Sequence, residues 1–367
     1  ASRQYHDTTR RPQRASERGS PVPRTITLGQ HSITAPERVA AIFDAVVRAG
    51  ACLPAFCTEN EWTTHAIVEA VDEMATELGA SVLPICVSAT GHHSMRTQLL
   101  NYAPGVGRRA RDAAIEGVDH MLFDLDRALE GTRNTVLAVP HLDHGDPTDD
   151  ADLIEYVLEH RLMGTLMYDC SHHSDDENLR MTQAFVERTR GTVLVEGICE
   201  QILEPGQKRD AGTATDTEVV VRYVQEAQPF LVVANLGTEH RVTRDDYKPE
   251  YRGDVAQALT AALGRRMLCL HGTSSLTDQG LGRLPEDGVI KINIWTRVER
   301  EGARALAQYV KDHDTGYVTQ QDLDVFPLCN VRRAWMARVK TVYREYMQQL
   351  NYANLRDVQG ELRAVRD

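Results

Sequence analysis

The sequence predicts an α/β protein built as a (β/α)8 TIM barrel, with an extra N-terminal arm and C-terminal helices. Eight short apolar runs alternate with helical segments, and their near-continuous apolar composition indicates parallel strands that are buried on both faces. Three of these runs end in a polar tip that carries a histidine. The length of 367 residues is normal for such a barrel with insertions.

The eight expected strands are spaced so that a helix fits between most consecutive strands. They cover residues 51–57, 81–88, 135–144, 164–171, 192–200, 230–240, 267–272 and 289–296. Helices are expected from about residue 35 and over residues 61–78, 150–160, 176–190, 217–228, 297–312 and 328–350, with extra helix within 101–133. Eight β–α units favour a closed barrel over an open doubly wound sheet.

Composition and charge limit the partners and the compartment. The formal net charge of −12 argues against a nucleic-acid partner, because phosphate binding needs a basic face. No apolar run reaches the ~18 residues that span a membrane, and the N-terminus lacks the apolar core of a signal peptide. The seven cysteines form no CxxC pair, and most lie in or beside apolar runs, which suits a reducing cytoplasm. We therefore expect a cytoplasmic protein with a small-molecule partner, and neither a nucleic-acid nor a membrane partner.

The N-terminal region differs in composition from the rest of the chain. Residues 1–34 are rich in Arg, Ser, Pro and Thr, which is typical of an arm that is poorly ordered or docks on a neighbouring subunit. Residues 35–367 are expected to form a single barrel domain that ends in a helical extension.

Three histidines predict a metal site. His144, His240 and His271 stand at the ends of the third, sixth and seventh expected strands. Neutral imidazoles suit Zn²⁺, and three protein ligands with one open position are typical of a catalytic zinc. These three histidines are far apart in the sequence, so they can meet only if the C-terminal ends of parallel strands lie at one rim. A (β/α)8 barrel has its active site at that rim. A lone histidine is more often a hydrogen-bonded core residue, but three at three strand ends favour the metal.

Six segments at expected strand ends, in the right order, resemble the class II (zinc-dependent) fructose-bisphosphate and tagatose-bisphosphate aldolases. The resemblance covers roughly residues 36–350. ACLPAFCTEN is similar to the family's AVPAFNxxN, HLDHG to HxDHG/C, MYDCSHHSDDEN to MIDASHLPFEEN, LGTEHRVTRDDYKP to IGTxHGxYKxxP, LHGTSS to LHGGSG, and GVIKINIWT to GVxKINxxT. One such match is weak, but six in order identify a divergent member.

The resemblance implies a lyase that makes or breaks a C–C bond next to a carbonyl, through the zinc-stabilised enediolate of a dihydroxyacetone-phosphate-like ketose. It implies that His144, His240 and His271 hold Zn²⁺ or another divalent metal, and that Asp143 exchanges a proton with the substrate hydroxyl at the bond. The metal would polarise the carbonyl and the carboxylate would move the proton. Asp143 could instead orient His144. The family also implies a homodimer or homotetramer, and a monovalent cation is conceivable.

Further positions match the family around this centre. Asp169 and Glu196 match acids near a mobile metal position, and could equally serve to orient imidazoles. The expected substrate-binding positions are Asn293, Ser274, Thr296, Gly272, Ser88 and Lys248, although Lys248 is as readily a solvated loop charge.

The departures from the family pattern fall on substrate-handling positions and spare the metal set. Arg241 replaces a glycine and could clamp a phosphate or a carboxylate. Thr273 replaces the second glycine of HGGSG, Trp295 places a large ring beside the phosphate pocket, and Cys57 replaces an asparagine. We therefore expect metal-dependent aldolase chemistry on a different substrate, in a biosynthetic rather than a glycolytic enzyme.

The loop after the fifth expected strand lacks the family's proton-donating glutamate. Glu200, Glu204 or Asp210 could replace it, but none aligns cleanly. This loss favours a first alternative, a metal-dependent isomerase, epimerase or hydrolase on the same barrel. A second alternative is a non-catalytic aldolase-like protein, against which the retention of Asp143 argues. A Schiff base on Lys291 is conceivable, but the metal histidines make it superfluous.

Overall fold

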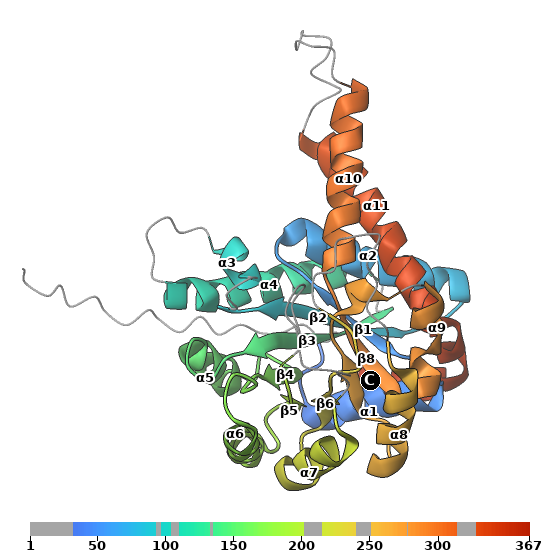
Figure 1. Cartoon of the computed structure of the whole chain (residues 1–367). Helices are drawn as coiled ribbons and strands as arrows, with labels where there is room; N and C mark the ends of the chain where they lie inside the picture. Colours follow the sequence, from blue (N-terminus) through green and yellow to red (C-terminus); the bar gives the residue numbers. More distant parts are fainter. Residues whose placement is uncertain are drawn as a thin grey trace, which may run out of the picture.

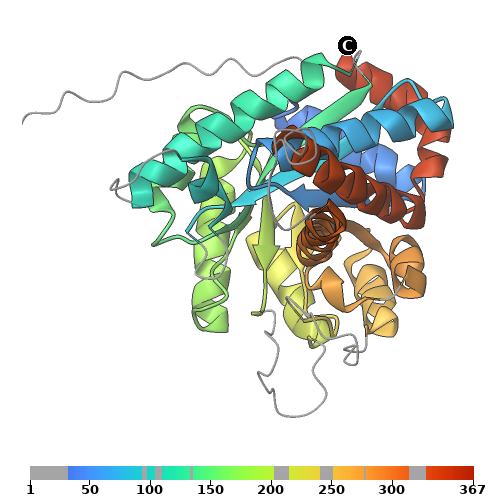
Figure 2. The same cartoon turned by 90° about the horizontal axis from the view of Figure 1, so that it is seen from above.

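A computed structural model confirms the barrel. It describes residues 32–92, 97–103, 110–132, 135–201, 215–239, 251–276, 278–313 and 328–367. Eight parallel strands follow one another in chain order around the sheet, and the last strand pairs with the first to close it. The helices lie around the outside of the strands (Figure 1), as the view from above also shows (Figure 2).

The strands begin within two residues of the expected starts. They are β1 (Leu53–Cys57), β2 (Leu83–Thr90), β3 (Val136–Gly145), β4 (Thr165–Tyr168), β5 (Leu194–Ile198), β6 (Leu231–Val233), β7 (Leu268–Leu270) and β8 (Val289–Ile294). Several strands end earlier than expected, most clearly β6. Ala234 and Leu236 remain buried after β6 has left the sheet, so an apolar run outlasts the strand that it contains.

The helices that were expected are present. They are α1 (Pro36–Arg48), α2 (Glu61–Leu78), α5 (Ala151–Glu159), α6 (Asp175–Thr189), α7 (Thr217–Ala227), α10 (Thr296–His313) and α11 (Leu328–Gln349), and α3 (Gln98–Tyr102) and α4 (Ala110–Glu130) occupy the long connection between β2 and β3. Capping explains the sharp ends of α2. The Asn60 side chain accepts a hydrogen bond from the Thr63 N–H, and Gly79 ends the helix in the left-handed conformation.

In the described part of the chain, three helices and two 3-10 helices were not expected. They are α8 (Gly253–Leu263), α9 (Asp278–Asp287), α12 (Gln359–Arg366), η1 (Thr273–Ser275) and η3 (Tyr352–Val358). Pro285 lies inside α9 and obscures its helical pattern in the sequence.

An apolar layer between strands and helices holds the barrel together. Phe56 of β1 packs against Tyr343 of α11 with ring centroids 4.4 Å apart, and both side chains are buried. Beyond this contact, α10 and α11 project together from the barrel in Figure 1 and point toward the viewer in Figure 2.

The end of the expected N-terminal arm contacts the barrel. Ile33 is fully buried and donates a backbone hydrogen bond to Ala138 of β3, 2.7 Å away. Residues 1–31 lie outside the described part of the chain. Among the described helices, none combines the length and the apolarity that a membrane crossing requires.

Candidate active site

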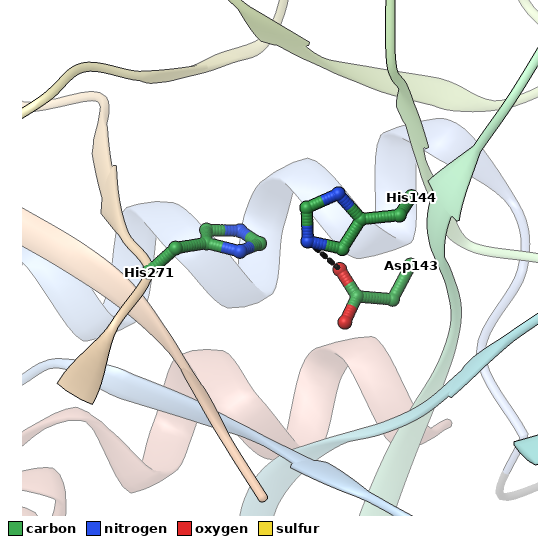
Figure 3. Close-up of side chains that lie close together, drawn as sticks. All are labelled: Asp143, His144 and His271. Atoms are coloured by element: carbon green, nitrogen blue, oxygen red, sulfur yellow. Dashed lines mark ion pairs between the residues drawn. The ribbon is translucent and has the colours of Figure 1, made fainter. Parts of the chain in front are cut away.

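The C-terminal ends of β3 and β7 bring Asp143, His144 and His271 together (Figure 3). All three side chains are buried, and one possible ligand atom of each lies within 4.8 Å of the other two. The two imidazole rings meet edge to face, with centroids 5.0 Å apart. His144 Nε2 lies 3.9 Å from Asp143 Oδ1. A buried carboxylate and two imidazoles therefore converge where barrel enzymes carry their active sites.

The backbone of β3 explains how two consecutive residues face one site. In a regular strand, neighbouring side chains point to opposite faces. His144 has a φ of 51°, in the left-handed region, and the pairing of β3 with β4 shifts between Leu142 and Gly145. This irregularity turns His144 to the side that Asp143 faces. A left-handed non-glycine residue is strained by about 1–3 kcal/mol, and such strain gathers at functional sites.

Asp169, which follows β4, orients His144. Its Oδ2 lies 2.7 Å from His144 Nδ1, and its Oδ1 accepts hydrogen bonds from the Ser171 N–H and hydroxyl. Burial raises the pKa of Asp169, but the hydrogen bonds from His144 and Ser171 outweigh burial and hold the pKa well below its usual range. The ionised carboxylate therefore accepts from Nδ1 and directs Nε2 toward Asp143. Histidines that bind metals are commonly oriented in this way.

Glu196 of β5 stands in the same relation to His271. His271 Nε2 lies 3.2 Å from Glu196 Oε1, and Lys291 Nζ lies 2.8 Å from Glu196 Oε2. Burial lowers the pKa of His271, so its imidazole is in the neutral form that binds metals. Burial raises the pKa of Glu196, but the Lys291 ammonium and the His271 hydrogen bond reverse this and lower it.

A second group of possible ligands lies beside the first. Glu196, Cys269 and His271 also offer ligand atoms within 4.8 Å of one another. This group suits a metal less well, because the Lys291 ammonium already lies 3.6 Å from Cys269 Sγ and burial raises the pKa of that thiol well above its usual range. The imidazoles of His144 and His271, which lie beside Asp143, are therefore the better fit for a divalent cation.

Two of the expected substrate-binding residues lie near Asp143, Asn293 in direct contact with it and Ser88 linked to it through Cys57. Asn293 of β8 donates a hydrogen bond from Nδ2 to Asp143 Oδ1 at 2.8 Å. Ser88 of β2 is fully buried, and Cys57 Sγ lies 3.8 Å from its hydroxyl and 3.9 Å from Asp143 Oδ2. The asparagine, serine and cysteine therefore surround the carboxylate on the β1, β2 and β8 side.

Gly272, which follows β7, packs closely against the segment that follows β6. Its φ is 69°, and a Cβ there would lie 2.7–2.9 Å from backbone atoms of Glu239. Thr238 also donates a hydrogen bond to the carbonyl oxygen of His271, at 2.7 Å. The segment that follows β6 therefore contacts the end of β7 through Thr238 and Glu239. His240 itself lies outside the described residues, as do Arg241, Lys248, Glu204 and Asp210.

The remaining expected residues lie at the rim. Ser274 lies in η1 after β7, and Thr296 is the first residue of α10 after β8; both are half-buried. Glu200 follows β5 and accepts a hydrogen bond from the Thr215 hydroxyl at 3.1 Å.

Two polar residues have surroundings that the sequence did not indicate. Lys291 is fully buried, with its ammonium held by ionic and hydrogen-bonding partners, so a nucleophilic role in a Schiff base does not fit. His92 is half-buried, and its Nδ1 lies 2.7 Å from buried Asp150. Gly91 permits this approach, because a Cβ there would lie 2.2 Å from the Asp150 carboxylate. Two features of the sequence could have drawn attention to these residues. Lys291 interrupts an apolar strand, and Gly91 stands directly before His92.

The fold and these residues define a barrel protein with a polar, metal-compatible centre at its C-terminal rim, and comparison with known proteins assigns its family. The class II fructose-bisphosphate aldolase family matches residues 37–355, so the chain belongs to this family. Fructose-bisphosphate aldolases from two Streptococcus pneumoniae strains, serotype 4 (ATCC BAA-334 / TIGR4) and ATCC BAA-255 / R6, are each 28% identical to it over 188 residues. That alignment covers 49% of this chain and 60% of each relative, which is consistent with a divergent member.

Solved structures share the fold. The fructose-bisphosphate aldolase from Campylobacter jejuni matches with a TM-score of 0.69 and 16% identity, over 88% of this chain and 96% of that chain. The YdjI aldolase from Escherichia coli K12 matches with a TM-score of 0.57 and 19% identity, over 85% and 95% of the two chains. At these identities the likeness concerns the architecture alone.

Proposed function

We propose that this protein is a metal-dependent class II-type aldolase, a lyase that makes or breaks a C–C bond beside the carbonyl of a phosphorylated ketose. Membership of the aldolase family supports this activity. The observation that carries the proposal is the buried group of Asp143, His144 and His271 at the C-terminal rim. An isolated carboxylate or imidazole would not support it, because this chemistry needs an electrophile and a proton carrier side by side.

In this proposal, His144, His240 and His271 hold Zn²⁺ or another divalent cation. The donor set fits, since Asp169 orients His144 and burial keeps His271 neutral. When bound, the cation would polarise the substrate carbonyl and stabilise the negative charge that develops beside it. Asp169 and Glu196 would act by orienting the two described imidazoles, which their hydrogen bonds favour.

Asp143 would exchange the proton of the substrate hydroxyl at the breaking bond. Its Oδ1 is held by the Asn293 amide, and its Oδ2 faces Cys57 and the Ser88 side of the barrel. The hydrogen bond from the Asn293 amide thus fixes the Asp143 carboxylate at a defined position. Asn293 would thus both contact substrate and hold the proton carrier in place.

The phosphate of the substrate would bind at the ends of β7 and β8. Backbone N–H groups near Gly272 and Ser274, and the N-terminus of α10 at Thr296, suit an anion. Arg241 and Lys248 would add positive charge. A biosynthetic role, a cytoplasmic location and a homodimeric or homotetrameric assembly remain part of the proposal.

The decisive experiment supplies the zinc-loaded protein with ¹³C-labelled dihydroxyacetone phosphate and a panel of aldehydes, and identifies the products. We expect a new C–C bond with at least one aldehyde, and little cleavage of fructose 1,6-bisphosphate. Isomerised or epimerised ketone without condensation would favour the alternative class, which the missing loop glutamate supports. A protein that binds no divalent metal would contradict both the aldolase proposal and the metal-dependent isomerase, epimerase or hydrolase.

A further inference from the structure

Lys291 sits inside the barrel with three oxygen or nitrogen acceptors around its ammonium group, and with Cys269 Sγ farther away at 3.6 Å. Its Nζ lies 2.8 Å from Glu196 Oε2, 2.5 Å from Asn293 Oδ1 and 3.3 Å from His141 Nε2. These acceptors come from β5, β8 and β3, so the ammonium group is held by three different strands. An ammonium group carries three donors and accepts nothing. Its hydrogen-bonding capacity is therefore used in full.

The protonation states of this cluster are set by burial and by one another. Burial lowers the pKa of His141 to about 3, and the Lys291 ammonium adds to this effect. The imidazole is consequently neutral; its Nδ1 faces the Thr165 hydroxyl at 2.8 Å, and its Nε2 can accept from Lys291. Burial would lower the pKa of Lys291, but nearby acidic groups, including Glu196, outweigh it and keep the side chain charged.

Strand geometry connects Lys291 to Asn293. Residues two apart on a strand point to the same face, so the KIN sequence stacks the lysine and the asparagine inside the barrel. A side-chain amide has one accepting end and one donating end. Since Lys291 only donates, it takes Oδ1, and Nδ2 then points to Asp143 Oδ1. The reversed amide would set an oxygen against a carboxylate and an N–H against an ammonium.

We propose that Lys291 is a positioning residue, which fixes the Asn293 amide so that Asp143 receives an N–H. Glu196 and His141 hold the ammonium from the far side, so it cannot follow a rotating amide. The inference rests on the proposed function in one respect, namely that Asp143 carries the proton. To that function the inference adds a chain of hydrogen bonds from Lys291 through Asn293 to Asp143. The position of the lysine fixes the asparagine amide, and the amide in turn fixes the carboxylate.

A purely structural role for Lys291 would be to neutralise Glu196. The two roles are separable, because different N–H groups contact Glu196 and Asn293. Lys291→Met alone leaves a buried carboxylate without its cation and is expected to destabilise the barrel. The double variant K291M/E196Q removes both charges, while the Asn293 side chain stays. Glu196→Gln is therefore the reference for every comparison.

The kinetic test is a cycle of variants in the E196Q background, comprising K291M, N293A and both together. We expect K291M to lower kcat by about tenfold or more, with KM changed by less than about threefold. In the N293A background the same change should lower kcat by less than about twofold, since the lysine acts through the asparagine. A loss that is equal in both backgrounds would overturn the proposal. Lys340→Met, which removes an outer ammonium paired with Glu69 and Glu73, is the matched control.

Two measurements do not need turnover. Zinc affinity should be the same in E196Q and K291M/E196Q, because the lysine is not a ligand. A crystal structure of K291M/E196Q should show the Asn293 amide displaced from Asp143 or spread over several rotamers. An amide that keeps a single position at Asp143 would overturn the positioning role, whatever the activity. If the unaltered zinc protein forms no C–C bond, the proposed function fails, and this crystal structure decides the inference alone.

Discussion

Removal of the Asp169 carboxylate should weaken metal binding without unfolding the barrel. The hydrogen bond from His144 Nδ1 to Asp169 Oδ2 is 2.7 Å long and both groups are buried. A charge-assisted bond of this kind is worth about 1.5–3 kcal/mol. If that energy serves to orient the imidazole, Asp169→Ala should weaken zinc binding by roughly 10–100-fold, as the loss of a carboxylate that orients a ligand commonly does.

The assay is competition for Zn²⁺ against a chromophoric chelator, with the folded state checked by circular dichroism. Asp169→Asn should lose less affinity than Asp169→Ala, because an amide oxygen still accepts from Nδ1. Asp149→Ala, in the exposed turn after β3, is the control and should bind zinc normally. Equal affinity in Asp169→Ala and the unaltered protein would refute the orienting role.

Two further predictions concern stability. Gly272→Ala should lower the free energy of unfolding by roughly 1–3 kcal/mol in urea titrations, since its φ is 69° and the new Cβ would lie 2.7–2.9 Å from the Glu239 backbone. Gly191→Ala has a φ of 78° but nothing within 4 Å, so it isolates the conformational strain; equal losses in both variants would contradict the packing argument. Burial, together with the Glu59 carboxyl to which it is hydrogen-bonded, raises the pKa of Glu299 to about 8. The folded protein therefore holds an extra proton between the unfolded and folded pKa values, and stability should fall as pH rises from about 5 to about 8, by about 1.4 kcal/mol for each unit of separation. Glu299→Gln should remove this fall, and identical slopes in the two proteins would show that another group is responsible.

The sequence was sufficient for the barrel and for much of its rim. The helical pattern of residues 61–78 predicted α2, and the tips of the third and seventh apolar runs predicted that Asp143, His144 and His271 lie at the rim. The sequence did not indicate how these two consecutive residues of β3 (Val136–Gly145) could face one site. The left-handed backbone of His144 supplies the physical means.

The pairing of carboxylates with imidazoles could not be predicted. Asp169 contacts His144 and Glu196 contacts His271, and these contacts depend on the register between strands and on one shifted pairing in β3. Register does not follow from the composition of each strand. The role of Lys291 was hidden for the same reason, because its acceptors on β3 and β5 are distant in sequence.

The most direct test of the account compares C–C bond cleavage by the zinc-loaded protein and its Asp143→Asn variant, on the ketose phosphate that the condensation screen identifies. We expect the same zinc content in both proteins and a kcat lower by roughly 10²–10⁴-fold in the variant, because the proton of the substrate hydroxyl has lost its carrier. A variant that retains its zinc and cleaves at the rate of the unaltered protein would contradict the account.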